Sequence, residues 1–497
     1  MLTVGNALSA SVRRHRDKTA LIFGDRALTF NDFDSRVNRF AQALMAEGVQ
    51  PGDRVALLLP NGLTMAEAYF ATARAGAVAV PINVRWAAPE IRYVLEDSGP
   101  RLVIAGEEFR DALPEAPNIL IGDRWEEKVQ DAPDADPAVA VSETDPWVIV
   151  YTSGTTGRPK GAVRDHRSNV MIALILVAEL GITSDDVGMA LLPMFHVNSM
   201  WFVTLSLAIG ATCVVYPHRT FHPGHVVEEL NRTEATYSMF VPSMLSFLAD
   251  AAERGALDPR HLRVAMTSSA PLDAALRDRL LRVFPRANLY DIYGATEYGG
   301  VTMIRHQTGG PVGTVGWPAI GQTIRIFRDD YTPTATGEVG EVGIAGPTLM
   351  REYWKRPEET AAAFHDGFLT LGDMGYLDEA GRLVLVDRKQ DMIIVAGENV
   401  YPSEVEGVLV ADPSVALAAC IGLRDERRGE SVVAAVVPLP GQTVDVERLH
   451  ALCRDNLADY KRPRTIEVWP ELPLGPAGKV VRRLVRQQWV QRAAGTH

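Results

Sequence analysis

Short β-rich runs alternate with longer helical patterns along roughly the first 390 residues, and this alternation constrains the fold more than any other feature of the chain. The runs fall at residues 55–59, 78–80, 102–105, 147–151 and 212–216. The segment 64–75 is typical of the helical stretches between them. Such alternation predicts parallel βαβ units, in which helices cover a mostly parallel sheet. From 313 to 344, short strands with glycine-rich turns predict a small antiparallel unit.

A second domain is expected to begin near residue 390. The chain has 497 residues, which is more than one domain of about 150 residues would need, so more than one domain is expected. The polar run Arg388-Lys389-Gln390-Asp391 follows the strand-like segment 383–387 and precedes a new strand-like segment, 392–395, and a helix-like segment, 402–409. We therefore predict an N-terminal domain at 1–387, a hinge at 388–391 and a C-terminal domain at 392–497.

Composition and charge exclude several classes of protein. With 47% hydrophobic and 23% charged residues, the chain is neither disordered nor fibrous. A net charge of −12 opposes general attraction to nucleic acid or to an anionic membrane. Cys213, Cys420 and Cys453 form no disulfide or zinc pattern. These features, with no secretory signal before the charges at 13–18, predict a cytoplasmic protein.

The segment 193–217 lacks charged residues and is long enough to be considered as a membrane span. It contains several polar residues, and its pattern changes from helix-like at 202–209 to β-branched at 212–215. This change favours a buried helix followed by a buried strand. We therefore expect no transmembrane segment.

The strongest local motif is the run from Thr152 to Gly161, directly after the strand-like segment 147–151. Its glycines let backbone N–H groups approach an anion, its hydroxyls add donors, and Lys160 adds a positive charge. The spacing differs from that of the P-loop. A purely structural turn would not need so many hydroxyls beside a lysine, so we predict a polyphosphate site. Its candidate residues are Thr152, Ser153, Gly154, Thr155, Thr156, Gly157 and Lys160.

This run resembles the phosphate-binding loop of the adenylate-forming superfamily, which contains acyl-CoA synthetases, peptide-synthetase adenylation domains and luciferases. The resemblance extends over nearly the whole chain. Tyr293-Gly-Ala-Thr-Glu297 is similar to the second family signature, and Leu371-Gly-Asp-Met-Gly-Tyr376 to the third. Asp387 to Asp391 resembles the hinge, Ala396-Gly-Glu-Asn399 the start of the mobile domain, and Gly478-Lys479 the site of the late catalytic lysine.

The resemblance implies a role for each of these residues. Thr296 would contact the α-phosphate, Glu297 would bind Mg²⁺, Lys479 would act in catalysis, and Gln390 would be the hinge pivot. Asp373, joined by Arg388, would hold the ribose hydroxyls. The other residues assigned to cofactor binding are Ser269, Ala270, Pro271, Ile292, Tyr293, Gly294, Gly397 and Glu398.

These roles also make physical sense without the family. A carboxylate such as Glu297 is a hard oxygen ligand of the kind that holds Mg²⁺ beside phosphates. Asp373, between glycines, can accept hydrogen bonds from both hydroxyls of a ribose. The alternatives are a surface glutamate for Glu297, a helix cap or Asx-turn for Asp373, and a surface arginine for Arg388.

His196 lies in an apolar stretch, where a lone histidine is often a core side chain. In the family the matching histidine lines the acyl pocket and helps place the carboxylate. Phe195-His196-Val197 offers no aspartate to pair with an α-amino group, which disfavours an amino-acid substrate. The sequence departs from the family at Ile292 and Ala396, where relatives often have glycine, and Ile292 would raise the floor of the pocket.

The implied fold is a large multi-layer α/β N-terminal domain with a small β-barrel subdomain, plus a smaller mobile α+β C-terminal domain. The implied reaction uses ATP and Mg²⁺ to activate a carboxylic acid as acyl-AMP, then transfers the acyl group to coenzyme A. The alternatives are transfer to a carrier protein and a non-catalytic nucleotide-binding regulator. The uncharged segment 193–209, with Phe240, Val241 and Met244, predicts an apolar pocket. The acid is not identified, and a homodimer is left open.

Overall fold

The computed structural model describes residues 1–114, 118–152, 159–258, 260–268, 272–307, 311, 313–389, 391–395, 398–425, 429–457, 459–475 and 480–494. The described residues form two compact units. The first comprises Met1–Thr323 and Ile344–Leu369, and the second comprises Ile324–Gly343 and Thr370–His497.

One sheet of the first unit contains most of the β-rich runs seen in the sequence. Its strand order is β18 (Glu352–Tyr353), β8 (Lys160–Asp165), β7 (Pro146–Thr152), β4 (Val78–Pro81), β3 (Arg54–Leu58), β5 (Leu102–Ala105) and β6 (Ile119–Ile121). The pairs β7–β4, β4–β3, β3–β5 and β5–β6 are parallel, whereas β8 pairs antiparallel with both β7 and β18. The predicted parallel βαβ units are confirmed.

A second sheet of the same unit carries the remaining candidate strands. Its order is β15 (Trp317–Pro318), β14 (Gly299–Arg305), β13 (Asn288–Ala295), β12 (Val264–Thr267), β11 (Tyr237–Phe240), β9 (Val187–Ala190), β10 (Thr212–Val215), β1 (Thr19–Phe23) and β2 (Arg26–Thr29). The strands from β13 to β1 pair in parallel, and the outer pairs at each end are antiparallel.

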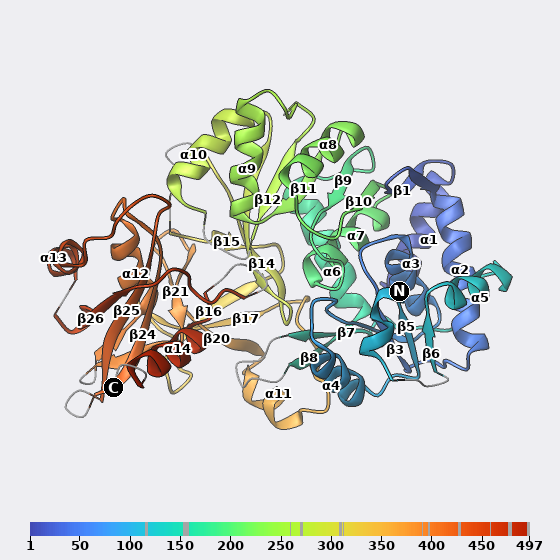
Figure 1. Ribbon diagram of the computed structural model, residues 1–497. Coiled ribbons are helices and arrows are strands. Elements are labelled where there is room, and N and C mark those ends of the chain that lie inside the picture. The colour runs from blue at the N-terminus through green and yellow to red at the C-terminus, as the bar shows by residue number, and fades with distance from the viewer. Residues whose placement is uncertain are drawn as a thin grey trace. The chain divides into compact units, whose positions relative to one another are not determined.

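The strands of these sheets are buried on both faces because helices pack against each face. In β3, Val55 and Leu57 enter one core cluster, whereas Ala56 and Leu58 enter another on the opposite face. This explains why the run is continuously apolar rather than alternating. On one side, α1 (Val4–His15), α2 (Phe30–Ala46), α3 (Leu63–Arg74) and α5 (Asp123–Asp131) pack against one another (blue to cyan in Figure 1).

The uncharged segment 193–217 forms helix α7 (Val197–Ala208) followed by strand β10. Both elements are almost entirely buried, so the expected buried helix and strand are confirmed. None of the described helices combines the length and the hydrophobicity that a bilayer crossing requires.

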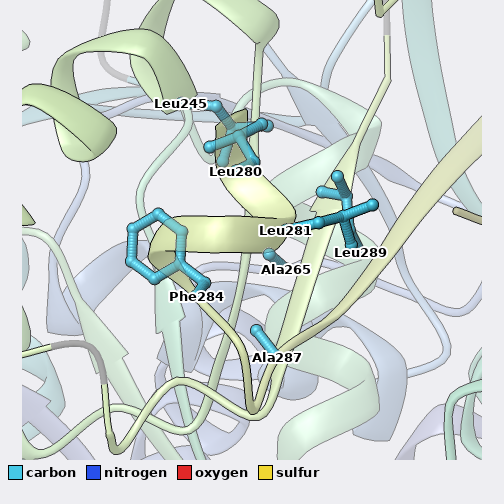
Figure 2. A pocket seen from close by; sticks show the side chains of 7 residues that line it. All are labelled: Leu245, Ala265, Leu280, Leu281, Phe284, Ala287 and Leu289. Carbon is cyan, nitrogen blue, oxygen red and sulfur yellow. The ribbon is translucent and has the colours of Figure 1, made fainter. Parts of the chain in front are cut away.

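A further core lies between the second sheet and helices α9 (Pro242–Glu253) and α10 (Ala274–Val283). Figure 2 shows a small pocket within it, lined by Leu245, Ala265, Leu280, Leu281, Phe284, Ala287 and Leu289. Every lining side chain is a hydrocarbon. The pocket therefore belongs to the core packing and offers no side-chain group to hold a carboxylate or a phosphate.

The second unit contains most of a small sheet and the C-terminal α+β part. The small sheet orders β16 (Thr323–Phe327), β17 (Gly340–Ala345), β20 (Phe368–Leu377) and β19 (Phe364–His365), with β21 (Leu383–Arg388) antiparallel to β20. The next sheet orders β23 (Glu398–Val400), β22 (Ile393–Val395), β25 (Gly429–Pro438) and β24 (Val415–Asp425), with β26 (Thr465–Val468) on β25. Its helices are α12 (Pro402–Val410), α13 (Val446–Asn456) and α14 (Arg482–Ala494).

The predicted elements near the second domain compare well with this unit. The strand expected at 392–395 is β22 and the helix expected at 402–409 is α12. The segment 313–344 does not form one unit, because Trp317 and Pro318 pair with Met303 and Thr302 of β14 in the large sheet. The predicted boundaries of the two domains, at 387 and 392, depend on movement about the hinge between them. They stay a prediction.

Candidate active site

The two ends of the predicted phosphate loop lie side by side. Thr152 ends β7 and Lys160 begins β8, and these two residues face each other across the antiparallel pair. The loop residues Ser153, Gly154, Thr155, Thr156 and Gly157 lie outside the described residues. The hairpin thus fixes where the loop starts and where its lysine stands.

Lys160 has two close neighbours that the sequence interpretation did not include. Its ammonium group forms an ion pair with the carboxylate of Glu359 on α11 (Pro357–Ala363). The same nitrogen lies 5.5 Å from the ring centroid of Tyr353. The Lys160 side chain remains 21% exposed, so an incoming anion has access to it.

Tyr353 also contacts the candidate magnesium ligand. Its hydroxyl donates a hydrogen bond of 3.1 Å to Oε1 of Glu297, and the hydroxyl of Thr152 donates to the same oxygen at 3.5 Å. Glu297 is buried, with 8% of its surface exposed. Tyr353 thus lies between Lys160 and Glu297, and Thr152 contacts the same carboxylate.

The segment that carries Tyr353 and Glu359 is tied to the base of the loop. The backbone N–H of Trp354 donates to Gly161 O at 2.7 Å, and the N–H of Tyr353 donates to Thr360 Oγ1 at 2.9 Å. Proline and acidic residues at the start of the run Pro357-Glu-Glu-Thr360 signal a helix start, which is the pattern that could have located α11.

The donor set around Glu297 fits Mg²⁺. This ion prefers oxygen ligands and commonly uses one or two carboxylates together with substrate phosphates. Glu297 supplies such a carboxylate, close to the Thr152 hydroxyl and the Lys160 cation. Within the described part of the chain, no group of three or more His, Cys, Asp or Glu side chains could hold a metal ion.

The residues before Glu297 lie on β13, which pairs with β14 through an irregular register between Tyr293 and Gly294. A Cβ atom on Gly294 would lie 2.1 Å from the carbonyl oxygen of Gly299, so this close approach requires glycine. Tyr293 forms a hydrogen bond between its hydroxyl and that of Tyr298. Ile292 is 5% exposed and lies opposite Met303 within the core.

His196 stands at the start of α7, where its Nδ1 accepts a hydrogen bond from the N–H of Asn198 at 3.3 Å. The surrounding protein lowers the pKa of this imidazole to about 4, so the ring is neutral at pH 7. The side chain nevertheless remains exposed. His196 is therefore not a core side chain, and its ring is accessible from the surface of the first unit.

The candidate ribose residues belong to the second unit. Asp373 on β20 and Arg388 on β21 are direct partners in the antiparallel pair, and Asp373 is buried. The backbone of Glu398 lies on β23, opposite Val395. Ser269, Ala270, Pro271, Gln390, Gly397 and Lys479 lie outside the described residues, as do the side chains of Arg388 and Glu398.

The chain matches the AMP-binding enzyme family over residues 8–354 and the AMP-binding enzyme C-terminal domain over residues 404–479. It is 36% identical to feruloyl-CoA synthase of an Amycolatopsis species, covering 96% of this chain and 98% of that protein. It is also 36% identical to the fatty acid–[acyl-carrier-protein] ligase ScoC of Streptomyces coeruleorubidus, covering 95% of this chain and 93% of that protein. The crystal structure of ATP-bound MatB from Rhodopseudomonas palustris superposes with a TM-score of 0.89 at 28% identity. The match covers 98% of this chain and 99% of that chain.

Proposed function

Because the chain belongs to the AMP-binding enzyme family and is an AMP-forming ligase of carboxylic acids to coenzyme A, we propose that its substrate is an uncharged hydrophobic acid activated at the site around Lys160. The observation that carries the location of the nucleotide in this site is the cluster of Thr152, Lys160 and Glu297, joined through Tyr353. A cation, a metal-binding carboxylate and a hydroxyl at one loop suit a nucleoside triphosphate.

In adenylation, the carboxylate of the acid attacks the α-phosphorus of ATP and pyrophosphate leaves. Mg²⁺, when bound with ATP, neutralises charge on the phosphates. We assign Glu297 as its protein ligand, Lys160 as a phosphate cation and Thr296 as a donor to the α-phosphate. Lys479 would approach the same oxygens, and Asp373 with Arg388 would hold the ribose. The contribution of these residues is placement and electrostatic stabilisation of negative charge.

His196 would orient the acid. Because its Nδ1 accepts the hydrogen bond from Asn198, a neutral ring carries its proton on Nε2. An Nε2–H group is a suitable donor to one oxygen of a substrate carboxylate. Phe195 and Met239 are half-buried apolar side chains packed against the core that contains α7, and Met244 is a half-buried apolar side chain of α9 packed against another core of the same unit. They support an aliphatic, alicyclic or aryl tail.

After adenylation, the thiol of coenzyme A displaces AMP from the acyl group. Gly397 and Glu398 are assigned to the path of its pantetheine arm on the family resemblance. A cytoplasmic location, a role in fatty-acid metabolism and a homodimer belong to the same proposal. Sedimentation analysis of the purified chain tests the homodimer, and fractionation of the source cells tests the location.

Acid-dependent exchange between ATP and labelled pyrophosphate tests the proposed substrate class. A panel of carboxylates should include saturated chains of graded length, alicyclic acids, aryl acids and amino acids. We expect exchange with apolar acids and none with amino acids. Preference for an amino acid or a dicarboxylate would overturn the assignment of the acyl pocket.

A carrier protein is the second candidate acceptor, because ScoC is as similar to this chain as feruloyl-CoA synthase is. Equal amounts of enzyme that has formed the acyl-adenylate of the best acid should be mixed with free coenzyme A or with a purified acyl carrier protein. Rapid acyl transfer to coenzyme A supports the first acceptor. Transfer to the carrier protein alone supports the second.

A further inference from the structure

Arg164 is a fully buried charge close to the candidate active site. It lies next to the last residue of β8, the strand that Lys160 begins, and its side chain has no exposed surface. Burial lowers the pKa of its guanidinium to about 10, so the group remains charged at pH 7. Placing a charge in the interior is costly unless hydrogen bonds compensate it. Such a residue requires a reason beyond packing.

No ion pair compensates this charge among the residues that the structure describes. Asp165 and Glu297 act on it only at longer range. The guanidinium instead lies 5.1 Å from the ring centroid of Trp201, in the range of a cation–π contact. Its Nε atom has no hydrogen-bond partner within the described chain.

The hydrogen bonds of Arg164 go to the backbone beside the Thr296–Glu297 turn. Nη1 donates to the carbonyl oxygen of Thr296 at 2.8 Å, and Nη2 donates to the carbonyl oxygen of Thr348 at 2.6 Å. A rigid, planar fork of this kind fixes the distance between two acceptors. Arg164 therefore ties two backbone segments that are far apart in the sequence.

The second segment completes the support of the same turn. The hydroxyl of Thr348 donates to Tyr298 O at 2.7 Å, and the N–H of Met350 donates to Glu297 O at 2.5 Å. The carbonyl oxygens of Thr296, Glu297 and Tyr298 thus each accept a hydrogen bond from Arg164 or from the segment 348–350. Because these hydrogen bonds fix the backbone of the turn, they also fix the directions in which the side chains of Thr296 and Glu297 leave it.

We propose that Arg164 is a positioning residue for adenylation, which holds the Thr296–Glu297 turn in the geometry that binds MgATP. This inference rests on the proposed function, because that function assigns Thr296 and Glu297 to the α-phosphate and the metal. Arg164 does not touch the substrate in this role. Its buried positive charge also adds to the field that attracts phosphates.

Binding of Mg²⁺ with a non-hydrolysable ATP analogue, measured by calorimetry, tests the proposal without requiring turnover. The variants are Arg164→Leu, which removes the donors and the charge, and Arg164→Lys, which keeps the charge but loses the fork. We expect binding of the magnesium complex to weaken at least tenfold in both. Hydrogen exchange of the backbone amides from 294 to 300 should quicken in parallel.

The matched control is Arg74→Leu on α3, another buried arginine whose Nε atom has no partner among the described residues. Arg74 donates to Asn38 and Asp34, away from the candidate site. Both leucine variants are expected to lower the melting temperature. Only the Arg164 variants should weaken MgATP-analogue binding at temperatures where every variant is folded.

Thr348→Val provides a second route if Arg164→Leu does not fold. It removes the hydroxyl that holds Tyr298 O and leaves the carbonyl that accepts from Arg164. We expect a smaller loss of analogue affinity, of about threefold to tenfold. Unchanged binding in both Arg164→Lys and Thr348→Val would overturn the proposal. If the wild-type chain binds the analogue but supports no pyrophosphate exchange, the proposed function fails while the role of Arg164 is still decided by binding.

Discussion

The ammonium group of Lys160 is paired with the carboxylate of Glu359, so the lysine expected to hold phosphate already has an anionic partner. Both side chains are partly exposed, and an ion pair of this kind contributes about 0–1 kcal/mol. A triphosphate carries more charge than one carboxylate and can displace it. Glu359 would then hold the lysine extended until ATP arrives and compete weakly with the nucleotide.

Glu359→Gln should therefore tighten ATP binding. Loss of the competing carboxylate is expected to lower the KM for ATP by about twofold to fivefold, the range that up to about 1 kcal/mol allows. Pyrophosphate should also become a stronger product inhibitor. Pyrophosphate exchange at varied ATP concentration measures both effects, and the exposed neighbour Glu358→Gln is the control. A higher KM in Glu359→Gln would show that Glu359 is needed to place Lys160.

Ile292 is expected to limit the size of the acyl group. Its side chain is buried opposite Met303, and its Cγ2 atom would lie 3.3 Å from a Cβ placed on Gly300. Ile292→Gly should shift kcat/KM toward longer or bulkier acids, with each newly buried methylene worth at most about 0.8 kcal/mol. The cavity should also lower stability by several kcal/mol.

Leu289→Ala is the matched control for that substitution. Leu289 lies on the same strand as Ile292 but packs into the core on the other face of the sheet. It should lose stability without any change in the preferred acid. An unchanged chain-length profile in Ile292→Gly would mean that another residue forms the floor of the pocket.

Much of the fold could be predicted because parallel strands buried on both faces are continuously apolar. The runs at 55–59 and 102–105 became β3 and β5 for this reason. The site motifs were recognisable because phosphate chemistry requires glycine, hydroxyl and lysine close together in the sequence. Thr152 and Lys160 meet in space because they flank one hairpin.

The contacts of Glu359, Tyr353 and Arg164 could not be predicted in the same way. Tyr353 reaches Glu297 because β18 pairs with β8, and two-residue strands leave almost no pattern in a sequence. Arg164 stands beside Asp165 at the end of β8, and an arginine in a strand normally argues for exposure rather than full burial. Only the tertiary structure reveals the backbone carbonyls that compensate its charge.

Asp291 should make stability depend on pH. Burial raises the pKa of this carboxyl from its ordinary value near 4 to about 7. Between these values the folded chain keeps a proton that the unfolded chain has released, so stability falls as pH rises from about 4 to 7. Each pKa unit corresponds to about 1.4 kcal/mol. Asp291→Asn should remove this dependence and melt at a higher temperature than the wild type at pH 8, but not at pH 4.

Thermal unfolding at pH 4, 6 and 8 measures this difference. The exposed Asp455→Asn on α13 is the control and should follow the wild-type profile. If Asp291→Asn loses the same stability at every pH, the carboxyl is ionised in the folded chain and serves as a hydrogen-bond acceptor.

Lys479→Ala should abolish most of the adenylation activity. The lysine is expected to meet the carboxylate and α-phosphate oxygens, where negative charge concentrates in the first step. Loss of one preorganised donor of this kind costs about 10²–10³ in rate. Pyrophosphate exchange should fall by that factor, whereas thioester formation from supplied acyl-adenylate should be largely spared. Equal losses in the two half-reactions would contradict this role.

The hinge prediction rests on a geometric conflict. Lys479 must reach the phosphates in the first step, and pantetheine must reach the same acyl carbon in the second. The chain before the predicted pivot, Gln390, is tied to the chain after it. Arg482 on α14 contacts Asp387 at 3.4 Å, and the N–H of Ser403 donates to Asp387 at 2.8 Å. Rotation about Gln390 would have to break these contacts with Asp387, while the pairing of Arg482 with Glu406 could persist.

Gln390→Pro should therefore separate the two half-reactions. Proline fixes φ near −65° and removes the backbone N–H, so it restricts the pivot without altering an assigned ligand contact. Acid-dependent pyrophosphate exchange should persist while acyl-CoA production falls by orders of magnitude. Glu379→Pro, in the exposed turn between β20 and β21, should leave both activities intact because proline suits the second position of such a turn. If Gln390→Pro makes acyl-CoA at the wild-type rate, the pivot lies at a neighbour such as Lys389 or the two steps share one arrangement.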